Sequence, residues 1–255
     1  MAKRKAGGAA DIGRLRDEIL EAGLRHVAFD GWSAKAFTAG AKNAGAGAAG
    51  LARAFPGGPK DAARHFGALT DRRMTAALGR LLRRKPMRTH ERVAAAVRAR
   101  LRILAPHREA VRRLFAFLAL PINASLATKL LWSAADAVWR AAGDTSTDFN
   151  YYTKRGLLAG VYGSTLLFWL SDESGDFAAT DAFLDRRIAD VMKIFSLRGR
   201  LKSAGEGLAF VRSLGEAFGR FVPPRPDASI RARVCSAAIF PAGAEIGSDP
   251  ASVLS

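Results

Sequence analysis

The chain has 255 residues, of which 49% are hydrophobic, and its mean hydropathy is +0.01. These values describe a globular chain that buries a substantial core, and they exclude a disordered or membrane-spanning protein. The longest charge-free run, 156–171, contains glycines and is shorter than the roughly 20 residues that cross a bilayer. No apolar signal region follows the basic start, so a cytoplasmic location is expected. The single cysteine, Cys235, excludes an intrachain disulfide.

The net charge of +17 is distributed unevenly. Residues 1–113 carry 25 of the 40 Lys and Arg and 9 of the 23 Asp and Glu, a net charge of +16, whereas the remaining 142 residues carry +1. Such asymmetry indicates a polyanionic partner for the front half, either nucleic acid or an anionic membrane surface. The alternative is that these arginines have no anionic partner and only keep the helix surfaces hydrated.

Apolar residues recur three and four positions apart along most of the chain, and alternating runs of β-branched residues are absent. This pattern predicts an all-α protein. Ser33 is a candidate N-cap, and Pro121 is expected to break or kink its helix. Glycine and proline interrupt the pattern at 30–31, 43–47 and 56–59. The predicted helices cover about 15–30, 33–42, 48–55, 60–85, 88–104, a segment from 106, 123–142, 147–170, 177–195 and 200–221.

The three short helices over 19–61 resemble the helix-turn-helix head of TetR-type proteins. Reading a DNA sequence needs polar side chains aimed at base edges, yet the presumed recognition segment, 47–55, offers only Arg53. Its two internal glycines also weaken a helix by about 1 kcal/mol each relative to alanine. We therefore expect a degenerate head without sequence-specific DNA binding, although weak, salt-sensitive binding to any polyanion stays open.

Residues 143–155 read Gly-Asp-Thr-Ser-Thr-Asp-Phe-Asn-Tyr-Tyr-Thr-Lys-Arg. The short polar side chains suit a turn between two helices and cap the second. Phe149, Tyr151 and Tyr152 crowd one helical turn, so at least one ring must point away from the core. An outward ring beside Lys154 and Arg155 indicates a docking surface. A capped helix start with one surface ring explains these residues equally well.

This string, with Leu-Ala-Gly-Val-Tyr at 158–162 and further matches to about 195, resembles the signature of the Coq-nine family. That family comprises TetR-like, lipid-binding accessory proteins of ubiquinone biosynthesis. The resemblance implies a non-catalytic homodimer that takes a polyprenyl quinone intermediate from the membrane and presents it to the di-iron demethoxyubiquinone hydroxylase. It implies docking through Asp148, Asn150, Tyr151, Tyr152 and Arg155, where Tyr151 replaces the usual tryptophan. The second hypothesis is a TetR-type regulator with an apolar effector.

The helices after residue 106 carry many large apolar side chains. Periodicity does not distinguish a filled core from a hollow one, and composition alone favours a filled core. The resemblance instead implies an apolar pocket that holds a quinone or phospholipid, with no other cofactor. Its expected lining is Phe115, Leu118, Leu130, Trp132, Trp139, Leu158, Val161, Tyr162, Leu166, Trp169, Leu184 and Ile188.

The segment 200–221 is predicted to be an amphipathic helix. Its apolar side chains fall on one half of the circumference, and polar ones occupy the other. Such a helix either packs on the body or lies on a membrane surface, and the resemblance favours peripheral attachment to the inner (cytoplasmic) membrane. The expected membrane face is Leu201, Leu208, Val211, Leu214, Phe218 and Phe221.

Catalytic chemistry is not expected. The four histidines lie on different predicted helices and form no metal-binding pair, and the acid pair Asp172-Glu173 is expected to cap the helix that follows. The predicted organisation is a basic disordered start (1–10), a degenerate helix-turn-helix head (11–70), a helical lipid-binding and dimerisation body (71–196), an amphipathic helix (197–222) and a disordered tail (223–255).

Overall fold

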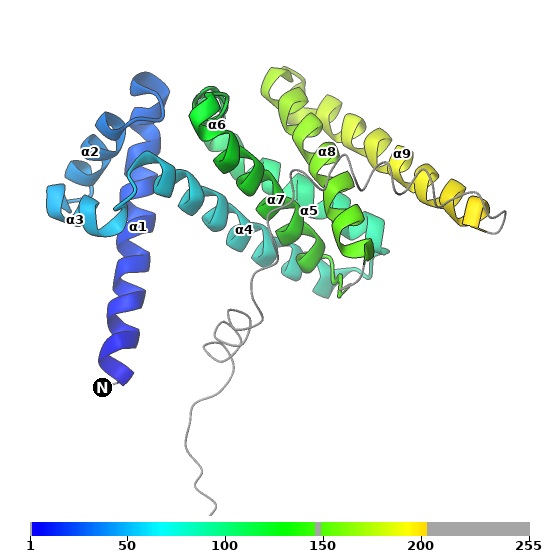
Figure 1. Cartoon of the computed structure of the whole chain (residues 1–255), viewed down its shortest axis with the longest axis horizontal. Coiled ribbons are helices and arrows are strands. Elements are labelled where there is room, and N and C mark those ends of the chain that lie inside the picture. The colour runs from blue at the N-terminus through cyan, green and yellow to red at the C-terminus, as the bar shows by residue number, and fades with distance from the viewer. Residues whose placement is uncertain (1, 146–148, 203–255) are drawn as a thin grey trace, which may run out of the picture. The chain divides into compact units, whose positions relative to one another are not determined.

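The computed structural model of the chain describes residues 2–145 and 149–202 (Figure 1). The chain divides into two units, Met1–Arg220 and Phe221–Ser255, and every described residue belongs to the first. All regular structure in these residues is helical, which confirms the all-α prediction. The α-helices are α1 (Ala2–Asp30), α2 (Ala34–Asn43), α3 (Gly47–Ala54), α4 (Pro59–Arg84), α5 (Thr89–Leu104), α6 (Arg108–Leu118), α7 (Ala124–Ala141), α8 (Phe149–Ser171) and α9 (Ala178–Lys202). Short 3₁₀ turns occupy Ala105–His107, Pro121–Asn123 and Gly175–Phe177.

Helices α1, α2 and α3 pack together as the head of the protein (Figure 1). The backbones of α1 and α2 cross closely, because a Cβ added to Gly40 would lie 2.5 Å from the Cα of Gly23. The hydroxyl of Ser33 accepts a hydrogen bond from the amide of Ala36 at 3.3 Å, as expected of an N-cap. Two glycines at this crossing therefore permit a contact that any larger residue would separate.

The body packs α4 against α5 and α7, α7 against α8, and α8 against α9. A buried polar contact joins three of these helices. The guanidinium of Arg100 on α5 is ion-paired with Asp71 on α4 and donates to the hydroxyl of Tyr162 on α8 at 2.8 Å. Because an unpaired charge in the core is costly, this contact fixes the register of the three helices.

Asp172 organises the turn between α8 and α9. Its carboxylate accepts hydrogen bonds from the amide and hydroxyl of Ser174 at 2.8 and 2.6 Å, and from those of Thr180 at 2.8 and 2.5 Å. The expectation that Asp172 caps the next helix is confirmed. Burial alone would raise the pKa of the Asp172 carboxyl, but the hydrogen bonds from Ser174 and Thr180 outweigh it and hold that pKa well below its usual value.

Asp172→Asn is expected to lower the free energy of unfolding by about 1–2 kcal/mol at neutral pH, because an amide cannot accept all four hydrogen bonds. Since the folded-state pKa of Asp172 is depressed, its contribution is present above the unfolded value of about 3.9 and is lost as the pH falls through the folded value. Thermal melting of both proteins over a pH series measures this. A difference that stays constant from neutral to strongly acidic pH would contradict the assignment.

The observed helices differ from the expected boundaries at two places. The start of the chain is helical from Ala2 rather than disordered, because α1 extends without a break from its packed part and each added residue gains a hydrogen bond. Helix α9 continues through Lys202, so the expected boundary between 196 and 197 falls inside one helix. No proline interrupts the chain there.

Leu208, Val211, Leu214, Phe218 and Phe221 of the expected membrane face, with the tail after 222, lie outside the described residues. Leu201 belongs to α9, and only its backbone is described.

Within the described residues, no single helix has both the length and the hydropathy of a membrane span. Thr89–Leu118 and Pro121–Ala141 meet these criteria only when taken together, and they are bent by 103°.

Candidate functional site at the turn between helices α7 and α8

The turn after α7 forms because Gly143 adopts a φ of +90°, which side chains disfavour. The amide of Gly143 donates to the carbonyl of Arg140, and that of Asp144 donates to the carbonyl of Trp139, both at 3.0 Å. This pair of bonds is the Schellman arrangement that ends many helices. The turn predicted from the 143–155 string therefore has a local cause, and it delivers Asp144 to the start of α8.

Arg155 on α8 is the centre of a buried ion-pair cluster. Arg155 is only 1% exposed, and its Nε donates a hydrogen bond to Oδ1 of Asp136 on α7 at 2.6 Å. Its Nη1 donates to Oδ2 of Asp144 at 3.2 Å, while Lys154 Nζ reaches Oδ1 of the same carboxylate at 2.8 Å. Arg140 also pairs with Asp136 at 2.7 Å, so two carboxylates meet three cations, and the cluster ties the turn to both helices.

Aromatic rings cover this cluster. The ring centroid of Tyr151 lies 3.5 Å from the guanidinium carbon of Arg155, and its hydroxyl donates to Asp136 at 3.3 Å. Tyr152 lies 5.1 Å from Tyr151 and 6.1 Å from Trp132 on α7, measured between ring centroids. All three rings are half-buried, so each keeps one part in contact with solvent. Burial, followed by the charge of Asp136, raises the pKa of Tyr151, so its hydroxyl stays protonated at neutral pH.

The expected docking residues divide into three groups. Tyr151 and Tyr152 are half-buried and lie at the surface of the site. Arg155 does not: its guanidinium is buried beneath Tyr151 and pairs with Asp136 and Asp144. Asp148 lies outside the described residues, and so does the side chain of Asn150.

Sequence reasoning missed Trp132 as a surface ring and Asp136 as the partner of Arg155. Asp136 had a signal, because it is the only charged residue in the apolar run 134–139. A carboxylate on an otherwise apolar helix face needs a cation from another element. We call Trp132, Tyr151 and Tyr152 the candidate docking surface, or docking surface for short.

The residues expected to line a lipid pocket occupy the interior of the body. Leu158, Val161, Tyr162, Leu166, Trp169 and Leu184 are buried, and Phe115, Leu118, Leu130, Trp139 and Ile188 pack against them in one hydrophobic cluster. Trp132 differs, because it contacts Tyr152 at the docking surface. Tyr162 also accepts the hydrogen bond from Arg100, so part of this set holds the body together.

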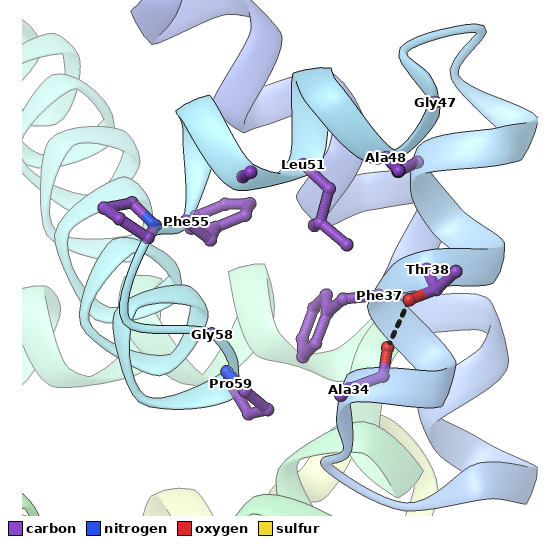
Figure 2. Close-up of a pocket in the computed structure, with 12 residues that line it drawn as sticks. Ala34, Phe37, Thr38, Gly47, Ala48, Leu51, Phe55, Gly58 and Pro59 are labelled. Carbon is purple, nitrogen blue, oxygen red and sulfur yellow. Dashed lines mark hydrogen bonds between the residues drawn. The ribbon is translucent and has the colours of Figure 1, made fainter.

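The head contains a shallow apolar cavity of about 230 Å³ between α2 and α3. Figure 2 shows the side chains of Phe37, Leu51 and Phe55 facing it. The one hydroxyl at its edge, that of Thr38, already donates to the carbonyl of Ala34 at 2.9 Å. Helix α3 exposes alanines and Arg53, so its outer surface has little to read a base pair with.

In the described part of the chain, no three His, Cys, Asp or Glu side chains form a group suited to a metal ion. The carboxylates of Asp136 and Asp144 are engaged by Arg155. The charged groups of the site thus pair with one another beneath the aromatic rings.

Comparison with known proteins places this region in a family. The sequence profile of the family COQ9 matches residues 124–195, which contain α7, α8 and most of α9. The ubiquinone biosynthesis protein COQ9 of Bos taurus is 37% identical over 201 residues, and that of Homo sapiens is 36% identical over 201 residues. Each alignment covers 76% of this chain and 63% of the relative. COQ9-B of Xenopus laevis is 35% identical over 201 residues, which cover 76% of this chain and 68% of that protein.

The names of all three relatives include the word mitochondrial. This chain spans somewhat less than two thirds of the length of the mammalian relatives. Since COQ9-B of Xenopus laevis is 35% identical over more than two thirds of its own length and over 76% of this chain, the chain belongs to the COQ9 family.

Proposed function

We propose that this protein takes part in ubiquinone biosynthesis as a non-catalytic lipid-binding component. In this role it takes a polyprenyl quinone intermediate from the membrane and presents it to the demethoxyubiquinone hydroxylase. Membership of the COQ9 family supports the pathway, because the relatives are named ubiquinone biosynthesis proteins.

The docking surface is the observation that carries the proposal. Large rings with few rotatable bonds make strong interface anchors when the free protein already holds them in place. The Arg155 guanidinium holds the Tyr151 ring in place. Ring contacts of Tyr152 with Tyr151 and Trp132 likewise hold the other two rings, on both α7 and α8. A partner protein therefore binds aromatic side chains that are already ordered, so little side-chain conformational entropy is lost on binding.

The composition of the body supports a lipid cargo. The residues proposed to line the pocket include Trp, Tyr and Phe side chains and lie between α6, α7, α8 and α9. An isoprenoid chain is flexible and apolar, and mobile apolar side chains can accommodate it with little polar rearrangement. We therefore propose that the interior of the body binds a quinone or a phospholipid.

We further propose a homodimer that attaches peripherally to a membrane. The alternative, a TetR-type regulator, is less well supported because the exposed face of α3 offers only Arg53 for base contacts.

Tyr152→Ala and Trp132→Ala are each expected to weaken binding to purified demethoxyubiquinone hydroxylase by about 2 kcal/mol, or roughly 30-fold in Kd, because each removes an interface anchor. Tyr151→Ala is a less suitable test, since that ring also covers Arg155. Titration calorimetry measures the affinities, and thermal melting reports folding.

Phe29→Ala provides the control, because Phe29 on α1 is 89% exposed and lies in the head. It should leave hydroxylase affinity unchanged. Wild-type affinity in both α7–α8 variants, with their folding intact, would reject the docking surface.

A further inference from the structure

The turn between α4 and α5 carries five exposed cations within nine residues: Arg80, Arg83, Arg84, Lys85 and Arg88. We call these five residues the basic turn. None of them makes an ion pair with any carboxylate of the described residues. The segment 80–88 itself contains no Asp or Glu. Like charges held this close repel one another, and an external anion relieves the repulsion.

Other arginines show that this arrangement is unusual for the chain. Arg72 pairs with Asp17 at 3.1 Å, Arg98 with Asp185 at 2.5 Å, and Arg112 with Glu109 at 2.6 Å. Arginines elsewhere thus commonly have a carboxylate partner, whereas the side chains of the basic turn have no ion pair among the residues that the structure describes; the nearby Glu91 carboxylate accepts a hydrogen bond from the Arg88 amide at 2.7 Å.

Apolar side chains are interleaved with these cations. Leu81 is 40% exposed, Pro86 is exposed, and Leu82 and Met87 are half-buried. A nucleic-acid backbone would leave such apolar surface in contact with water. The interface of a bilayer accommodates both kinds of side chain, because cations meet the headgroups while apolar groups enter the acyl boundary.

The basic turn lies beside the turn that carries the docking surface. Arg92 on α5 links them: its Nε donates to the carbonyl of Met87 at 2.8 Å, and its Nη1 donates to the carbonyl of Ala142 at 3.4 Å. A Cβ added to Gly143 would lie 3.4 Å from the same guanidinium. An external surface that binds the basic turn therefore also lies close to the α7–α8 turn.

We propose that the basic turn binds the phosphate groups of an anionic membrane surface, with Leu81 at the acyl boundary. The attachment orients the α7–α8 turn toward the bilayer. This inference rests on charge and exposure in the body, and it holds whether or not the bound cargo is a quinone.

The test is flotation of the full chain with vesicles of phosphatidylcholine, with and without phosphatidylserine, over a salt series. The variant Arg83→Gln, Arg84→Gln, Lys85→Gln removes three cations and keeps good helix formers. It is expected to raise the lipid concentration for half-maximal binding to the anionic vesicles by about 100-fold and to reduce the salt dependence. Neutral vesicles should bind both proteins equally.

The control variant Lys42→Gln, Arg53→Gln, Lys60→Gln removes the same number of charges from the head. These three cations also have no carboxylate partner among the described residues, and Lys42 and Arg53 are exposed. It should bind anionic vesicles within about twofold of wild type, since long-range charge effects are screened by salt. Residues 203–255 are the same in all three proteins, so any contribution they make cancels.

Three outcomes would overturn the proposal. The first is unchanged vesicle binding by the variant of the basic turn, with thermal melting as evidence that it is folded. The second is an equal loss in the head variant, which would mean that net charge alone drives binding. The third is tighter binding of wild type to random duplex DNA than to the anionic vesicles, with loss of that binding in the variant, which would assign the turn to nucleic acid.

Discussion

Arg155→Ala is expected to lower the free energy of unfolding by about 3–5 kcal/mol, because it removes the buried cation that pairs with both Asp136 and Asp144 and leaves them only the more exposed Arg140 and Lys154. The Asp144 side chain is 5% exposed and that of Asp136 is 16% exposed, so water cannot fully replace the guanidinium. Tyr151 also loses the group on which its ring lies. Urea unfolding followed by circular dichroism measures the change, and the same variant should bind the hydroxylase poorly.

Arg140→Ala is the matched control, since Arg140 pairs with the same Asp136 at 2.7 Å but its side chain is 67% exposed. Exposed pairs contribute little, and we expect less than about 1 kcal/mol. Equal losses from Arg140→Ala and Arg155→Ala would show that the burial of the cluster does not determine its energetic role.

Arg100→Ala is expected to have an effect of similar size, about 3–5 kcal/mol, at the contact of α4, α5 and α8. It leaves the carboxylate of Asp71 at 17% exposure and the hydroxyl of Tyr162 without its donor. The loss should appear as a lower midpoint in urea and as weaker retention of lipid, because Tyr162 belongs to the proposed pocket.

Arg102→Ala tests whether the loss of any arginine from α5 lowers the free energy of unfolding as much as Arg100→Ala does. Arg102 lies two residues along, its side chain is 72% exposed, and it approaches Asp181 only to 3.8 Å. A near-neutral effect is expected. A destabilisation as large as that of Arg100→Ala would contradict the three-helix contact.

Local chemistry made three of the helix boundaries predictable. Ser33 caps α2, the 56–59 segment separates α3 from α4, and Asp172 caps α9, all within a residue or two of the expected positions. Each signal depends on neighbours in the chain, so periodicity and turn residues are sufficient to find it.

The contacts that organise the site depend on residues far apart in the sequence. Asp136 and Arg155 are 19 positions apart, and Asp71 and Arg100 are 29 apart. The expectation for Arg155 came from the family resemblance of the 148–155 string, and only the tertiary packing shows that its guanidinium is enclosed. The 143–155 string thus indicated where the candidate site lies. Only the fold shows which of its side chains lie at the surface, such as Tyr151 and Tyr152, and which are buried, such as Arg155.

The boundary of α9 was missed for a related reason. A mixed polar stretch such as 196–202 contains no strong helix stop, and continuation of an existing helix is easier than nucleation of a new one.

Mass spectrometry of the lipids that co-purify with the full chain from quinone-producing membranes tests the central claim most directly. The account predicts a polyprenyl quinone intermediate or a phospholipid in a fixed ratio to protein, and its loss in Arg100→Ala but not in Arg102→Ala. Protein free of lipid that binds one short operator about a thousandfold more tightly than random DNA would contradict it.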